Sequence, residues 1–113
     1  MDSYKTGLFS EWLARMYLRL HGFKIISSRY ITGRNTHRAE IDIIAKRGNL
    51  IIFVEVKRRK SLMAAWGAIS PKQIQRLRLA AEGFLLRKRW TGDSRFDVLM
   101  MYGWHIKWIK NAI

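Results

Sequence analysis

The sequence contains no cysteine, one proline and few acidic residues. Without cysteine, the chain has no disulfide bonds, no thiolate zinc or iron–sulfur sites and no cysteine nucleophile. No apolar run is longer than five residues, whereas a helix needs about 20 apolar residues to span a bilayer. The N-terminal Met-Asp-Ser-Tyr-Lys lacks the apolar core and cleavage site of a secretory signal. We therefore expect a cytoplasmic protein with no membrane-spanning segment.

The shortage of acids leaves the chain strongly basic. Lys and Arg number 22 against 8 Asp and Glu, which gives 113 residues a formal charge of +14. This length suits one small domain, and no linker, repeat or low-complexity tract divides residues 1–113. Nucleic acid would relieve the self-repulsion by counterion release and is the expected partner. An anionic membrane surface or an acidic protein surface would also satisfy the charge.

Hydrophobic periodicity predicts the order of elements along the chain. A helix is expected at 8–20, with Gly22 as its C-terminal cap, and a short strand at 23–30. After a basic loop at 31–38, two strands at 39–45 and 50–57 form a β-hairpin. A second basic loop at 58–69 leads to a helix with Ser70 as N-cap and Pro71 in its first turn. Strands at 96–102 and 104–109, turning near Gly103, close an α/β or α+β domain around one sheet.

The predicted hairpin places most of the unexplained acids on one face. Side chains alternate between faces along a strand, so Glu40 and Asp42 share a face, while Ile41, Ile43 and Ala45 share the other. A turn centred on residues 47 and 48 pairs 45 with 50, 42 with 53 and 40 with 55. In this register the residues that converge are Glu40, Asp42, Glu55 and Lys57. The opposite, wholly apolar face is expected to be the core.

Clustered carboxylates repel one another and raise one another's pKa values. A divalent cation removes this conflict, and oxygen ligands of this kind suit Mg²⁺ or Mn²⁺. Lys57 would lie beside the cation, where it can orient a water molecule or contact a phosphate oxygen. The alternative is a solvated strand face on which neighbouring Lys and Arg simply neutralise the acids.

The same residues resemble a known nuclease motif. Asp42 followed by Glu55-x-Lys57 is similar to the Asp…(Asp/Glu)-x-Lys pattern of restriction-endonuclease-like nucleases. The first helix with Glu11 and the strings 39–45, 53–59, 95–98 and 105–112 resemble the small bacterial YraN-type family (UPF0102). The resemblance runs from about residue 7 to 112. It implies the fold of archaeal Holliday-junction resolvases, a restriction-endonuclease-like α/β domain with a central mixed sheet flanked by helices.

The resemblance also implies roles for single residues. Asp42 and Glu55 would bind Mg²⁺ or Mn²⁺, helped by the backbone carbonyl of Val56, and Lys57 would position or activate the attacking water. Glu11 would approach from the first helix as a catalytic residue, either as a further ligand or through a metal-bound water. The alternative for Glu11 is a surface pair with Arg15. Glu40 is a ligand or supports one. Asp97 is as well explained by a structural bond to Arg95 or to a loop amide.

Basic residues flank the expected site in the two loops and at the start of the second helix. Those expected to contact nucleic acid are Arg34, Arg38, Arg58, Arg59, Lys60, Lys72 and Arg76. Trp66 would stack on an unpaired base. The resolvase analogy further implies a two-fold homodimer, with the Trp-rich last strand as contact surface.

Three functions follow as hypotheses. The first is a Mg²⁺-dependent endonuclease that hydrolyses phosphodiester bonds in DNA, branched or structured. The second is a nucleic-acid-binding module whose nuclease-like fold no longer cuts. The third is a protein-interaction subunit whose basic face meets acidic partners.

Overall fold

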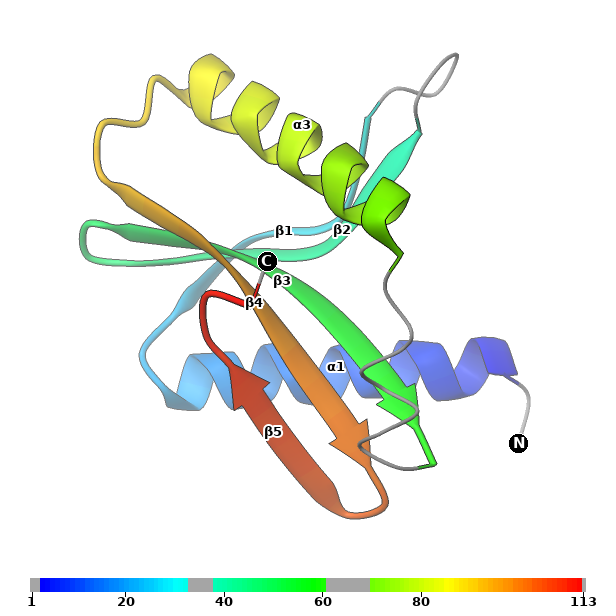
Figure 1. The fold of residues 1–113 in the computed structure, drawn as a ribbon. Coiled ribbons are helices and arrows are strands. Elements are labelled where there is room, and N and C mark those ends of the chain that lie inside the picture. Colours follow the sequence, from blue (N-terminus) through cyan, green and yellow to red (C-terminus); the bar gives the residue numbers. More distant parts are fainter. Residues whose placement is uncertain (1–2, 33–37, 61–69, 113) are drawn as a thin grey trace.

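The structure is a computed structural model that describes residues 3–32, 38–60 and 70–112. Its elements follow the order α1 (Ser3–Leu20), β1 (Lys24–Thr32), β2 (Ala39–Arg47), β3 (Leu50–Arg59), α3 (Pro71–Lys88), β4 (Asp93–Tyr102) and β5 (His105–Ile109) (Figure 1). The predicted order of helices and strands is confirmed. Most elements extend past the predicted ends, because hydrophobic periodicity marks the buried part of an element better than its last turn. Trp66 and Arg34 lie outside the described residues.

The five strands form one mixed sheet in the order β1-β2-β3-β4-β5. Only β3 and β4 run parallel, and the chain between them contains α3, as a parallel connection requires. The other neighbouring pairs are antiparallel. This arrangement confirms the predicted fold class, an α/β domain with a mixed sheet flanked by helices.

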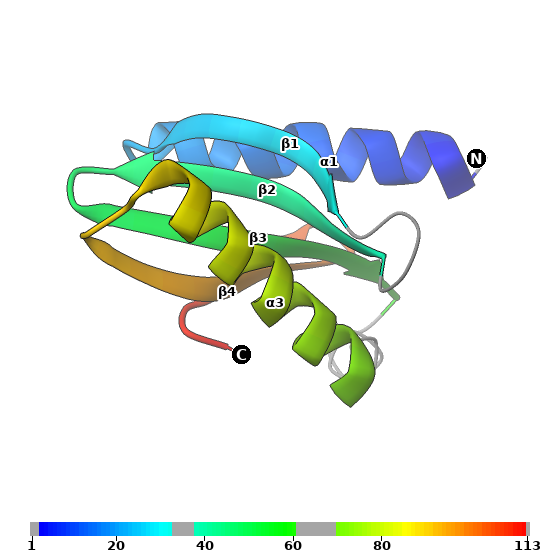
Figure 2. The same cartoon turned by 90° about the horizontal axis from the view of Figure 1, so that it is seen from above.

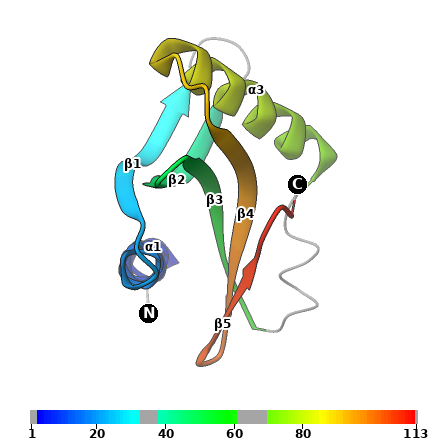
Figure 3. The same ribbon diagram turned by 90° about the vertical axis from the view of Figure 1, so that its left-hand side faces the viewer.

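Helices α1 and α3 cover opposite faces of the sheet. In Figure 2 the sheet lies between α1 and α3, and Figure 3 shows the same separation from another direction. On the α1 side, Ala14 and Leu18 pack against Ile43, Ile52 and other strand residues. On the α3 side, Leu77, Ala80 and Ala81 pack against strand residues such as Ile44 and Phe53. The core is therefore divided between two faces, and the single apolar face predicted from the hairpin accounts for only one of them.

The observed register of the hairpin differs from the predicted one by two residues. Arg47 pairs with Leu50 and Ile44 with Phe53, so the turn is Gly48-Asn49, with Gly48 at a φ of +58°. A left-handed turn residue of this kind suits a two-residue hairpin turn and leads directly into the strand. Because the shift is an even number, it does not by itself exchange the two faces of the hairpin. The change moves Asp42 from a position opposite Phe53 toward Glu55.

The alternation of faces on β2 breaks at Asp42. Ile43 belongs to the core under α1, but Ile41 belongs to the core under α3. On the neighbouring strand, Arg29 lies between the partners of these two residues and has a left-handed φ of +55°. The prediction that Ile41 and Ile43 share a face was wrong, because β1 and β2 are irregular at Arg29 and Asp42. This irregularity lies at the point where the acidic residues gather.

Both predicted caps are present. Gly22 has a φ of +85°, and the Phe23 N–H donates to the Leu18 carbonyl as α1 ends. The Ser70 Oγ accepts a hydrogen bond of 3.2 Å from the Gln73 N–H, and Pro71 opens α3. This cap stabilises the first turn of α3 and determines where the helix begins. Neither helix combines the length and hydropathy needed to cross a membrane within the described part of the chain.

Candidate functional site

A pocket of about 570 Å³ opens between the first turns of α3 and strands β2 and β3. Three acids line it, namely Glu40, Asp42 and Glu55. Lys57 joins them from β3, two residues after Glu55 on the same strand face. The structure thus brings together the four residues for which the hairpin pattern predicted convergence.

Asp42 is fixed in place by the backbone of the neighbouring strand. Its Oδ2 accepts a hydrogen bond of 2.8 Å from the Val56 N–H. The β2–β3 pairing extends only as far as Ile43 and Val54, so this contact takes over where the backbone pairing stops. The carboxylate of Asp42 is therefore held against β3, beside Glu55.

Glu55 is a buried carboxyl group. It is 4% exposed, and its Oε2 is buried without a hydrogen-bond partner among the described residues. Burial, a hydrogen bond with the Asp42 carboxyl group, and the charges of Asp42 and Glu40 raise the pKa of Glu55 to about 9, against a smaller opposing effect of Lys57. In the metal-free protein Glu55 is therefore protonated at neutral pH. A buried oxygen with no partner is an unusual feature that a bound cation would satisfy.

The rim of the pocket is basic. Arg38 precedes β2, while Lys72 and Arg76 come from the first turns of α3. Three predicted nucleic-acid contacts are thus placed around the acids. Carboxylates below a cationic rim suit a metal ion that is bound by protein oxygens and by a phosphate group at the same time.

The donor set fits Mg²⁺ or Mn²⁺ as part of a shared site. Across residues 3–32, 38–60 and 70–112, no three His, Asp or Glu side chains come close enough to hold a metal by themselves. Mg²⁺ commonly takes only one or two protein carboxylates and completes its shell with water and substrate phosphate. Asp42 and Glu55 match this pattern, whereas Glu40 lines the pocket without completing a three-residue cluster.

Glu11 is not brought to the pocket. It lies on α1, on the other side of the sheet, and its Oε2 accepts a 2.6 Å hydrogen bond from Nη2 of Arg29. Its side chain is largely shielded from solvent. The predicted alternative partner was Arg15, and the observed one comes from β1. The geometry therefore gives Glu11 a role in joining α1 to β1, and its role at the metal remains a prediction that this arrangement does not support.

Three further predicted nucleic-acid contacts within the described residues, Arg58, Arg59 and Lys60, do not line the pocket. Arg58 donates to the Ser10 Oγ on α1 at 3.4 Å, and Arg59 donates to the Arg58 carbonyl. Lys60 is exposed at the end of the described segment. Arg58 and Arg59 are the last two residues of β3, beyond Lys57, and neither lines the pocket.

Gln73 is a further residue of the pocket. It lines the cavity from the first turn of α3. Its position three residues after the Ser70 cap identifies that turn from the sequence alone. What the sequence does not show is that α3 lies directly over Glu55.

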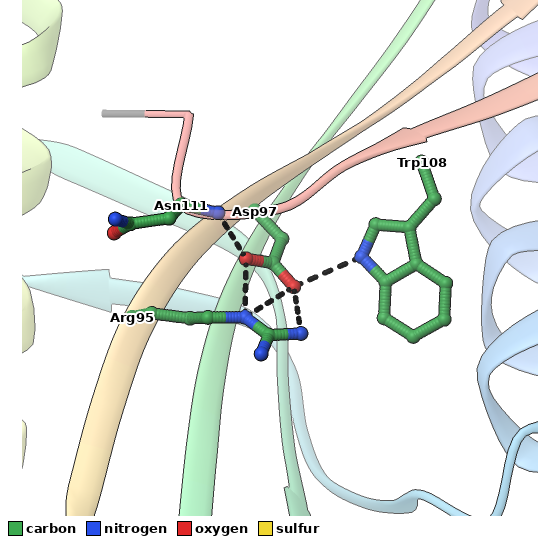
Figure 4. Close-up of polar contacts among 4 residues, drawn as sticks. All are labelled: Arg95, Asp97, Trp108 and Asn111. Carbon is green, nitrogen blue, oxygen red and sulfur yellow. Dashed lines mark hydrogen bonds and ion pairs between the residues drawn. The ribbon is translucent and has the colours of Figure 1, made fainter.

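Asp97 is structural, as one of its two interpretations predicted. The side chain is fully buried, and it accepts hydrogen bonds from Arg95, from Trp108 Nε1 and from the backbone N–H of Asn111 (Figure 4). These partners come from β4, β5 and the C-terminal turn. Asp97 therefore ties the last strand to the sheet and lines neither described pocket.

Comparison with known proteins identifies the family. A family model described as "Uncharacterised protein family UPF0102" matches residues 10–101. A UPF0102 protein of Mesorhizobium japonicum is 40% identical over 97% of this chain and 87% of its own length. Those of Paramagnetospirillum magneticum and Bradyrhizobium diazoefficiens are 36% and 41% identical, over 90% and 88% of this chain and 81% and 73% of their own lengths. This chain belongs to the UPF0102 family, as the motifs of its sequence predicted.

Proposed function

We propose that this protein is a metal-dependent endonuclease that hydrolyses phosphodiester bonds in DNA. The observation that carries the proposal is the pairing of Asp42 with buried Glu55, beside Lys57, at the floor of a pocket with a cationic rim. Two carboxylates that share a buried site are costly for folding. A cation that both can bind offsets this cost.

Each residue has a distinct part in this proposal. Asp42 and Glu55 would hold Mg²⁺ or Mn²⁺, which when bound supplies a Lewis acid for the phosphate and lowers the pKa of water. The Lys57 ammonium would orient the attacking water or neutralise charge on a phosphate oxygen. Arg38, Lys72 and Arg76 would hold the negatively charged backbone over the acidic floor.

The direct test is cleavage by the full-length protein. Labelled junction, flap, duplex and single-stranded DNA would be incubated with Mg²⁺ or Mn²⁺, beside the Asp42→Ala and Lys57→Ala variants. We expect metal-dependent cleavage by the wild type and its loss in both variants. Cleavage that survives in Asp42→Ala would indicate a contaminating nuclease and refute the assignment.

Two other outcomes have clear meanings. Salt-dependent binding of nucleic acid without cleavage by any metal-loaded sample would favour a silent binding module. Absence of nucleic-acid binding, with retention of an acidic protein partner after nuclease treatment, would favour the interaction subunit.

A two-fold dimer is a separate prediction. Trp104 is fully exposed in the turn between β4 and β5, on the surface expected to form the contact. If this turn joins two copies, Trp104→Ser should shift a dimer to a monomer in analytical ultracentrifugation. A monomeric wild type would remove the dimer from the proposal.

A further inference from the structure

A second, smaller cavity, here called the outer groove, lies on α3 next to the acidic pocket. It has a volume of about 310 Å³, and the described residues that line it are Lys72, Gln75, Arg76 and Leu79. Lys72 and Arg76 also line the acidic pocket. The two cations therefore form a wall between the cavities, and each side chain is available to both.

The described lining residues of the outer groove form one stripe along α3. Positions 72, 75, 76 and 79 follow the i, i+3, i+4, i+7 spacing of a single helical face. This face lies beside the stripe that packs on the sheet through Leu77, Ala80 and Ala81. The groove consequently begins where the pocket ends and runs along α3.

The chemistry of the outer groove differs from that of the pocket. None of its four described lining residues is acidic, whereas three acids line the pocket. Leu79 is 56% exposed, which leaves an apolar surface between cationic and amide side chains. The guanidinium of Arg76 can donate to phosphate oxygens, and Leu79 offers a surface for a sugar or the face of a base.

We infer that the outer groove binds the nucleotide next to the one in the pocket, so that the protein recognises a continuous nucleic-acid strand rather than an isolated phosphodiester. Lys72 and Arg76 would contact the phosphate between the two nucleotides. This inference rests on the proposed function for the identity of the ligand. It adds to the proposed function a second binding subsite, and it implies that a bound strand must be long enough to reach both cavities.

The test compares two probes that differ by one nucleotide. A thymidine dinucleotide contains one internal phosphate and a trinucleotide contains two. Their dissociation constants would be measured by NMR titration of the full-length protein in EDTA, so that no cleavage occurs. Leu79→Glu would place a negative charge in the outer groove only. Leu86→Glu is the matched control, because Leu86 is 78% exposed on the same helix and lines neither cavity.

We expect the wild type to bind the trinucleotide roughly tenfold more tightly than the dinucleotide. Leu79→Glu should remove most of this difference and change dinucleotide binding by less than about twofold. Leu86→Glu should preserve the difference. Uridine probes of the same lengths test which part of the strand is recognised. If the outer groove recognises the backbone that DNA and RNA share, Leu79→Glu should lose the same length discrimination with both kinds of probe. If it recognises deoxyribose, the loss should be confined to the thymidine probes.

Three results would overturn the inference: equal effects of the two variants, no effect of Leu79→Glu, or no binding of either probe by the wild type. Its failure is distinguishable from failure of the proposed function. If Leu79→Glu is without effect while Asp42→Ala abolishes cleavage, the endonuclease stands and the subsite falls. If the wild type never cleaves but length discrimination depends on Leu79, the subsite is supported and the proposed hydrolysis is refuted.

Discussion

The backbone N–H of Val56 donates a 2.8 Å hydrogen bond to Oδ2 of Asp42. A carboxylate held by the main chain of an adjacent strand has little freedom to turn away from its neighbour. Asp42 therefore remains beside Glu55 before any cation binds. Such preorganisation lowers the entropic cost of assembling a metal site.

Divalent metal should stabilise the protein through Asp42. A ligand that binds only the folded state adds about 2.7 kcal/mol at a concentration of 100 times Kd. We expect Mg²⁺ or Mn²⁺ to raise the melting temperature of the wild type, and to raise that of Asp42→Asn much less. Differential scanning fluorimetry over a metal titration checks this. Equal shifts in the two proteins would place the cation elsewhere.

Without metal, stability should fall as pH rises. The folded-state pKa of Glu55 is raised from 4.5 to about 9, so the folded protein keeps a proton that the unfolded chain loses. The associated stability is complete below about pH 4.5 and is lost progressively toward pH 9. At pH 7 this loss is on the order of 3 kcal/mol.

Glu55→Gln removes this titration, so the variant should be more stable than the wild type at pH 7 and show a flatter pH profile. Chemical denaturation in EDTA at several pH values measures the effect. Glu82→Gln is the control, because Glu82 is exposed on α3. If Glu55→Gln and Glu82→Gln gave the same profile, Glu55 would have an ordinary pKa.

Lys57→Met should separate catalysis from metal binding. Lys57 lines the pocket, but its ammonium cannot act as a ligand to a cation. We expect cleavage to fall by about 100-fold or more while stabilisation by metal persists. Lys107→Met, at an exposed position of β5, should retain activity. Comparable cleavage by both variants would leave Lys57 without a role in the reaction.

Arg76 should contribute to the salt dependence of binding more than Arg78. Both belong to α3, but only Arg76 lines the two cavities. Loss of one phosphate contact on a single strand should reduce the slope of log K against log salt by about 0.7. Fluorescence anisotropy over a salt series would compare Arg76→Ala with Arg78→Ala. Identical slopes would mean that α3 acts only through its net charge.

Asp97→Ala should lower the free energy of unfolding without altering the residues that line the pocket. It removes a fully buried carboxylate and leaves Arg95, Trp108 and the Asn111 N–H without their acceptor. Breaking a buried ion pair costs about 3–5 kcal/mol. Urea denaturation measures this loss, with Asp93→Ala as an exposed control. A loss below about 1 kcal/mol would show that these hydrogen bonds contribute little.

Strand alternation and capping residues were sufficient to predict the helices, the strands and the group of acids that line the pocket. Strand alternation predicted that Glu40, Asp42 and Glu55 converge, and all three line the pocket. The error of two residues in the register did not prevent this, because an even shift does not exchange the faces of the hairpin. The Ser70-Pro71 cap and the turn at Gly103 were equally readable, since they depend on neighbouring residues alone.

Other features depend on contacts between segments distant in the sequence. Pairing of Glu11 with Arg29, rather than with Arg15, follows from the packing of α1 against β1. Glu55 and the first turns of α3 line the same pocket, and helical periodicity does not tell which part of a sheet a helix faces. The outer groove exists only because the first turns of α3 stand beside the pocket.

By itself, therefore, the sequence determined the charge, the order of helices and strands, and the identity of the acids that share a strand face. Only the tertiary structure decided which of those acids meet, which one is buried, and which cations stand over them. The reason is physical: alternation and capping act over a few residues, whereas burial and pKa depend on every element packed around a group.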